Sequence, residues 1–217
     1  MSSSEDLFEC YEVEDGGVVI GDYHGDATDL VIPDTIKGEV VRAIYRYAFK
    51  NKGLKSVVLP PTLEEIHAEA FSTNQLTSIS FPEKLYYIGQ DAFYNNRLKS
   101  LVIPEAITYI GHGAFSRNAL EELKIEAPLE TIPDYCFTRN ALTSLSLPES
   151  VVEIRVSGFA YNNFVDLVIP RHIKEIGPQG FQGLEHIKRV RMPERFMNRI
   201  NNIFLDSAIE HAEFSAL

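Results

Sequence analysis

The stretch "LKSLVIPEAITYIGHGAFSRNA" at residues 98–119 directly follows "LTSISFPEKLYYIGQDAFYNNR" at residues 76–97. The two segments have equal length, carry Pro at the same position, and contain an Ala-Phe pair followed by Asn. Self-similarity at a fixed spacing is typical of repeat proteins, in which each unit forms one structural turn. The period of the chain is therefore the first property to establish.

Three apolar columns keep a period of 22 residues over seven copies. The first is a Phe that follows a small residue, the second is an Ile five residues earlier, and the third lies three residues before the Ile. The members are Phe49, Phe71, Phe93, Phe115, Phe137, Phe159, Phe181; Ile44, Ile66, Ile88, Ile110, Ile132, Ile154, Ile176; and Val41, Leu63, Leu85, Ile107, Leu129, Val151, Ile173. One unit cannot bury its own apolar row, whereas stacked units cover one another. The columns predict a solenoid with an internal file of phenylalanines.

Each unit reads approximately L-x-x-L-x-L-P-x-x-L-x-x-I-G-x-x-A-F-x-x-N-x. The alternating L-x-L before Pro indicates a short strand, because Pro lacks the N–H that would continue a ladder. The remainder has no helical period, so we expect turns with short-strand or 3-10 segments. The sequence thus predicts one parallel β-sheet on one face and a return path elsewhere. We expect local distortion at Pro128, at Arg155 and Val156, and after Phe181, where the pattern shifts.

Two more columns within the repeat have a structural and a functional interpretation. The first is an Asn column, which predicts a hydrogen-bond ladder that satisfies turn backbone, with ligand contact as the alternative. Its members are Asn74, Asn96, Asn118, Asn140 and Asn162. The second precedes each Phe with Ala, Gly or Cys136. Close stacking explains these small residues and favours a buried Cys136 over a reactive thiol.

The two ends of the chain depart from the repeat and are expected to cap it, since terminal rungs expose apolar surface. In residues 1–24, two alternating runs flank Asp15-Gly16-Gly17, which is typical of a β-hairpin. In residues 194–217, Phe196, Ile200, Ile203 and Phe204 share one helical face, which predicts a capping helix. With residues 25–193 as repeats and no linker, we expect a single leucine-rich-repeat domain over 1–217.

Composition limits the classes of partner. The chain has 217 residues, 45% of them hydrophobic, and a net charge of -11. An acidic surface repels phosphate groups, so we expect neither nucleic-acid binding nor membrane insertion. Two distant cysteines give no disulfide framework. The first residues lack a signal-peptide pattern, which favours a cytoplasmic location; the alternative is a secreted or surface-exposed protein from which an upstream segment was removed.

The quoted repeats resemble the BspA-like leucine-rich repeats, a bacterial class with units of about 22 to 23 residues. The segment "DLVIPDTIKGEVVRAIYRYAF" resembles the entry to such an array, and the likeness covers about residues 25–195. The resemblance implies a right-handed solenoid. It also implies roles in protein binding and adhesion, and it carries over no catalytic residues.

The residues themselves predict no catalytic, cofactor or metal site. The six histidines lack H-E-x-x-H spacing, the cysteines lack C-x-x-C spacing, and no serine stands in a G-x-S-x-G motif. His67 and Glu69 fall in a return segment, and Gly111 and Gly113 lack the strand–helix context of a phosphate loop. We therefore expect a protein that is not an enzyme and needs no cofactor.

Corresponding positions of successive units build the face on which solenoids bind partners. One candidate is the outward strand column together with a basic cluster at its end: Val58, Ser80, Val102, Lys124, Ser146, Val168, Arg191, with Lys188 and Arg189. The alternative is that outward strand positions merely favour β-tolerant residues. A second candidate is Tyr87 with Tyr109, which either form an interface or pack down over the return segments.

The hypothesis for function is a non-enzymatic protein-binding scaffold that presents an extended solenoid face to a macromolecular partner. The alternative is an exported adhesin that recognises a host-surface protein or glycan. The sequence does not identify the partner or the oligomeric state.

Overall fold

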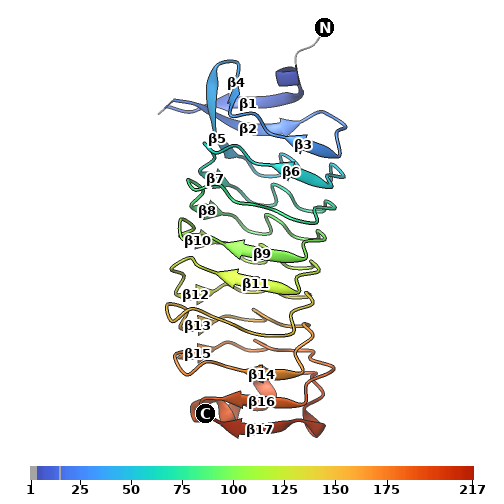
Figure 1. The fold of residues 1–217 in the computed structure, drawn as a ribbon, viewed down its shortest axis with the longest axis vertical. Helices are drawn as coiled ribbons and strands as arrows, with labels where there is room; N and C mark the ends of the chain where they lie inside the picture. Colours follow the sequence, from blue (N-terminus) through green and yellow to red (C-terminus); the bar gives the residue numbers. More distant parts are fainter. Residues whose placement is uncertain (1–3, 15) are drawn as a thin grey trace.

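The computed structural model describes residues 4–14 and 16–217. The chain winds into an elongated coil whose ends are formed by the two ends of the sequence (Figure 1). Each turn of the coil, called a rung below, is one repeat unit, and strands of successive rungs pair in parallel. This arrangement confirms the predicted solenoid.

The L-x-L segments form what we call the broad sheet. Its strands pair in three groups, β3–β6, β9–β11 and β14–β16–β17. Their bounds are Asp29–Val31, Ser56–Val58, Ser100–Ile103, Glu122–Ile125, Asp166–Val168, Arg189–Met192 and Glu213–Ala216. Pro ends these strands as expected and opens a turn. In one case the Pro60 carbonyl accepts the Leu63 N–H at 3.1 Å.

The broad sheet is interrupted, so the expectation of one continuous sheet is wrong. No strand forms at residues 78–80 or 144–146, although both segments are described. These are the two rungs with Ser at both outward positions, and Ser provides less cross-strand packing than Val or Thr. After Phe181 the register moves by one residue, so that Asp166 pairs with Arg189, which confirms the offset expected there.

The Ile column forms a second parallel ladder, the narrow sheet, where the sequence indicated only a return path. Its strands β5, β7, β8 and β10 continue from the N-terminal cap, and β12, β13 and β15 form a separate group. Their bounds are Glu39–Ile44, Glu65–Ile66, Tyr87–Ile88, Tyr109–Ile110, Thr131–Ile132, Glu153–Ile154 and Glu175–Ile176. Turns connect the two sheets, and the described repeat rungs contain no 3-10 helix.

A proline explains the break between β10 and β12. On other rungs the residue after the Ile donates its N–H to the Ile carbonyl of the preceding rung, as Gly111 does to Ile88 at 2.8 Å. Pro133 stands at that position and has no N–H to donate to Ile110. Distortion was expected in this rung at Pro128. No distortion appears at Arg155, where β13 pairs in register on both sides.

The phenylalanines stack in an internal file, as predicted. Ring centroids of successive members lie 5.0 to 5.9 Å apart from Phe49 to Phe181, and the rings are nearly parallel. Each Phe N–H also bonds to the small-residue carbonyl of the next rung, including Phe115 to Cys136 at 3.1 Å. A larger residue would collide in this column, since a Cβ on Gly180 would lie 2.6 Å from Ile176. Cys136 is fully buried, and burial raises the pKa of its thiol.

The Asn column forms the predicted hydrogen-bond ladder. The Asn162 amide donates to the Phe137 and Phe159 carbonyls at 3.0 Å, and its oxygen accepts the Leu142 N–H at 3.0 Å. Asn96 and Asn140 repeat this pattern one period at a time. Each amide therefore ties three backbone groups on neighbouring rungs, which supports the structural interpretation.

Two corners of each rung adopt positive φ. They repeat every 22 residues at Tyr47, Glu69, Asp91, Gly113, Tyr135, Ser157, Gln179 and at Asn51, Thr73, Asn95, Arg117, Arg139, Tyr161, Gly183. Only two of these fourteen positions carry Gly. A non-Gly residue in this region costs roughly 1 to 2 kcal/mol. The corner hydrogen bonds and the buried Phe file must offset that cost.

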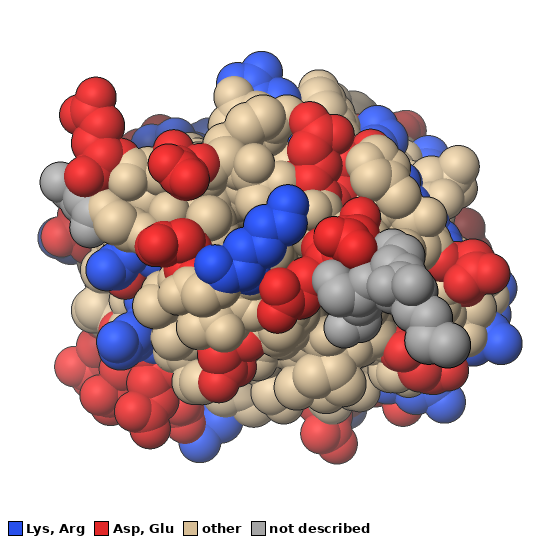
Figure 2. Space-filling model, turned by 90° about the horizontal axis from the view of Figure 1, so that it is seen from above, with Lys and Arg blue, Asp and Glu red and all other residues tan. Residues whose placement is uncertain are grey.

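The N-terminal cap is the expected hairpin. β1 (Phe8–Glu12) pairs antiparallel with β2 (Val18–Tyr23), and β2 pairs in parallel with β5. Asp15 lies outside the described residues. A second hairpin joins β4 (Thr35–Ile36) to β5, and a 3-10 helix, η1 (Ser4–Leu7), precedes β1. Figure 2 views this end, where Asp and Glu side chains lie across the surface with Lys and Arg between them.

The C-terminal cap is less helical than predicted. The segment forms a 3-10 helix η2 (Glu194–Arg199), a four-residue helix α1 (Ile200–Ile203) and a further 3-10 helix η3 (Ile209–His211). Phe204 stacks on Phe181 at 5.7 Å and extends the internal file. Arg199 donates to the Ile176 carbonyl at 2.8 Å and so satisfies the last narrow strand. The tail supplies β17, the expected edge strand.

Candidate partner-binding surfaces

The predicted outward column lies exposed along the broad sheet. Register places Val31 beside Val58, Val102 beside Lys124, and Val168 beside Arg191. Val31, which sequence reasoning missed, extends the column and is 68% exposed. Ser80 and Ser146 are also exposed, but they stand in the two rungs that form no strand. The column is therefore three separate groups rather than one continuous strip.

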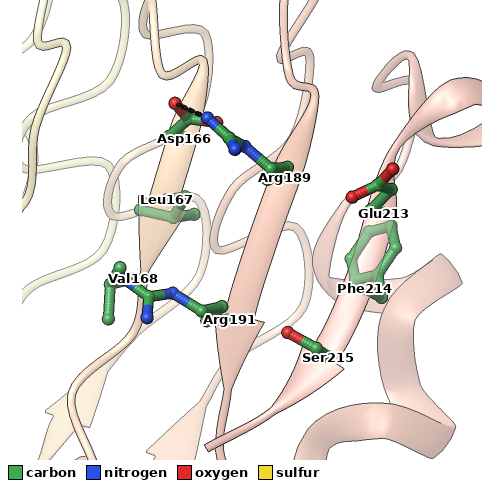
Figure 3. Close-up of a pocket in the computed structure, with 8 residues that line it drawn as sticks. All are labelled: Asp166, Leu167, Val168, Arg189, Arg191, Glu213, Phe214 and Ser215. Carbon is green, nitrogen blue, oxygen red and sulfur yellow. Dashed lines mark hydrogen bonds and ion pairs between the residues drawn. The ribbon is translucent and has the colours of Figure 1, made fainter.

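The basic end of this column is partly neutralised. Arg189 makes a bidentate pair with Asp166, with two N–O distances of 2.7 Å (Figure 3). These hydrogen bonds lower the pKa of Asp166 and raise that of Arg189. Arg191, on the same strand, lies beside Val168 and forms no ion pair with any described residue. Glu213 and Ser215 on β17 complete a shallow hollow of about 520 Å³. Lys188 is exposed next to this hollow, so two of the three predicted cations keep an unbalanced charge.

Tyr87 and Tyr109 lie together on the narrow sheet. Their rings stack with centroids 4.8 Å apart and planes 6° apart. Tyr109 is 49% exposed, whereas Tyr87 is partly buried and its pKa is raised, chiefly by burial. The pair stands on adjacent strands β8 and β10, where the main-chain ladder fixes its position.

The tyrosine pair ends a longer run of aromatic side chains, which we call the aromatic strip. Tyr11, Tyr45, His67, Tyr87 and Tyr109 succeed one another with centroid separations of 6.5, 5.8, 5.6 and 4.8 Å. Tyr86 lies beside it, and its hydroxyl donates to Glu65. Sequence reasoning missed the first three members. Tyr45 and His67 do occupy one repeat position, so the period contained that signal.

The described residues offer no other site with evident chemistry. No group of three or more His, Cys, Asp or Glu side chains in 4–14 and 16–217 is placed to hold a metal ion. Over the same residues, no helix has the length and apolar character required to cross a membrane.

Comparison with known proteins extends these observations. The model of the BspA-type leucine-rich repeat region matches residues 42–165 and 152–216, in six copies. No curated protein matches the sequence.

Several solved structures share the fold. A leucine-rich repeat protein of T. pallidum is 22% identical with a TM-score of 0.58, over 100% of both chains. One from Bacteroides ovatus ATCC 8483 is 19% identical with a TM-score of 0.64, over 97% of this chain and 66% of that one. The pneumococcal vaccine antigen PcpA is 20% identical with a TM-score of 0.64, over 85% of this chain and 62% of that one. Since the family model covers most of the sequence, the chain belongs to the BspA-type leucine-rich repeat family.

Proposed function

We propose that this protein is a non-enzymatic scaffold that binds a protein partner through the aromatic strip on its narrow sheet. The observation that carries the proposal is the run of stacked, solvent-facing rings from Tyr11 to Tyr109. Tyrosine is enriched at protein interfaces, because its ring supplies apolar area and its hydroxyl a polar contact.

The geometry of the strip favours binding for a further reason. Neighbouring rings contact one another, and the narrow-sheet ladder fixes the backbone beneath them. Side chains that are already ordered lose less conformational entropy when a partner covers them. A rigid aromatic surface therefore retains more of its contact energy as affinity.

The test is affinity capture from native cells with matched variants. Tyr87→Ala/Tyr109→Ala is expected to lose the captured partner. Tyr161→Ala, an exposed tyrosine in the turn after Phe159, is expected to retain it. The pair Lys188→Glu/Arg191→Glu reports on the broad-sheet end. If the narrow-sheet pair captures the same protein as wild type, the strip is not the binding surface; loss only with the basic pair would move the interface to the broad sheet.

A second candidate is an exported adhesin. Its support is the shared fold with the pneumococcal vaccine antigen PcpA. This candidate predicts that an antibody to the protein labels intact, unpermeabilised cells. Labelling only after lysis would exclude it, whereas the scaffold proposal stands with either result.

A further inference from the structure

A hollow lies where the narrow sheet is interrupted. It has a volume of about 590 Å³ and lies between the rungs of β10 and β12. Its lining includes Tyr109, Ile110, Glu130 and Asp134. It is called the Tyr109 hollow below. Because Pro133 donates no N–H, the Ile110 carbonyl lacks the ladder bond that the Ile88 carbonyl has. A hydrogen-bond acceptor is thus left at the hollow.

The wall of the Tyr109 hollow is an uncovered aromatic ring. Tyr87 covers one face of the Tyr109 ring at 4.8 Å. The residue at the matching repeat position on the next rung is Thr131, whose side chain has no ring to continue the stack. The other face of Tyr109 is therefore available to a ligand, at the point where the aromatic strip ends.

The charged groups around the hollow favour a cation. Glu130 is exposed and forms no ion pair or side-chain hydrogen bond with a described residue. Asp134 accepts only the Val156 N–H, at 3.0 Å, among the described residues. Arg155 also lines the hollow, but it is paired with Glu153 at 3.3 Å. Two carboxylates and a carbonyl therefore face the hollow with a single, already paired cation.

We propose that the Tyr109 hollow binds an arginine side chain of the partner protein, an inference that rests on the aromatic strip being the partner-binding surface. The guanidinium stacks on the open face of Tyr109 and donates to Glu130 and to the Ile110 carbonyl. Arginine suits this site because its planar group both stacks on aromatic rings and donates to carboxylates. The net charge of -11 adds a long-range attraction for a basic segment.

The test uses a fluorescein-labelled peptide in which Arg alternates with Ser, and a counterpart in which citrulline replaces each Arg. Citrulline keeps the shape of the side chain and removes its charge. Fluorescence anisotropy with the full chain is expected to give a Kd about tenfold higher for the citrulline peptide, as loss of a cation–π contact and a charged hydrogen bond implies. Equal affinity for both peptides, or no binding of the Arg peptide at millimolar concentration, overturns the proposal.

Variants locate the site. Tyr109→Ala is expected to raise the Kd of the Arg peptide about tenfold, and Tyr109→Phe to leave it nearly unchanged because the ring remains. Glu130→Gln is expected to raise it several-fold. Glu121→Gln removes an equally exposed carboxylate just before β11 on the broad sheet and is expected to have no effect. An equal effect of the two Glu variants would show attraction to overall charge rather than to the hollow.

Failure of this inference is distinguishable from failure of the proposed function. If Tyr87→Ala/Tyr109→Ala abolishes partner capture while the Arg and citrulline peptides bind equally, the strip binds a partner without a cation. If calorimetry detects a neutral oligosaccharide, tested as maltopentaose, and no Arg peptide, the open ring is a sugar platform and the arginine proposal falls.

Discussion

Replacing one asparagine of the internal ladder tests the central energetic feature of the fold. Asn162 and Asn163 are neighbours, but only Asn162 lies inside the coil. Asn162 is 4% exposed and binds the Phe137 and Phe159 carbonyls and the Leu142 N–H. Asn163 is exposed, and its side chain makes no hydrogen bond with a described residue. The adjacent residue is therefore a matched control.

The magnitude follows from the groups that Asn162→Ala leaves unpaired. The Phe137 carbonyl keeps a second donor, because Asn140 also reaches it at 3.1 Å. The Phe159 carbonyl and the Leu142 N–H have no other bond to a described residue. A buried group without a partner costs about 1 to 3 kcal/mol. We expect Asn162→Ala to lower the free energy of unfolding by about 2 to 4 kcal/mol, and Asn163→Ala to change it by less than about 0.5 kcal/mol.

The assay is urea-induced unfolding followed by far-UV circular dichroism, with amide hydrogen exchange at Leu142 as a local measurement. Exchange at this N–H should accelerate in Asn162→Ala and stay unchanged in Asn163→Ala. Equal free energies of unfolding for the two variants would refute the reasoning, since they would mean that water replaces the ladder at no cost.

Asn162→Asp adds a pH dependence with a defined sign. An ionised carboxylate here would be buried against two carbonyl oxygens, so its folded pKa should lie above the unfolded value of about 3.9. Relative to wild type, this variant is then most stable below the unfolded pKa and loses stability as the pH rises through the folded pKa. Unfolding measured across that range should show the gap to wild type widening with pH; a constant gap would contradict the assignment.

Four further predictions concern single side chains. Thr73→Gly should raise the free energy of unfolding by about 1 kcal/mol in urea titration, because Thr73 has a φ of 59° that only Gly adopts without strain; a loss of stability would argue against strain at the corners. Phe115→Ala should lower it by about 3 to 5 kcal/mol by the same assay, since it opens a gap in the internal file, and a change below about 1 kcal/mol would be incompatible with a packed file. Ellman's reagent should modify Cys10 but not the buried Cys136 in the folded protein; rapid modification of both thiols would place Cys136 at the surface. The hydrogen bond to Glu65 raises the pKa of Tyr86 to about 12, so Tyr86→Phe should remove a late-titrating tyrosine from the absorbance titration and Glu65→Gln should bring that transition to lower pH, whereas unchanged curves would mean that the bond does not form.

The period of the sequence predicted the solenoid, the Phe file and the Asn ladder, because each depends on one residue type recurring at one position. It did not predict the narrow sheet, since strands of two residues, such as β7, show no alternation along the chain. Their pairing is visible only between rungs. Pro133 could be interpreted as a ladder break only after that second sheet was known.

The surfaces were predicted less completely. Tyr87 and Tyr109 share a repeat position, so their proximity followed from the period. Tyr11 reaches the strip from the cap hairpin, which has no counterpart in the repeats. The Asp166–Arg189 pair depends on the one-residue register offset, which aligns residues that are 23 apart rather than 22.

The interruptions of the two sheets fall at different heights along the coil. Where the narrow sheet stops between β10 and β12, the broad sheet is paired through β9 and β11. Where the broad sheet stops, on either side of residues 78–80 and 144–146, the narrow sheet is paired. Every junction between repeat rungs thus retains at least one sheet connection. The molecule should resist bending like a stiff rod without a hinge, so a partner spanning several rungs would meet residues at nearly constant spacing.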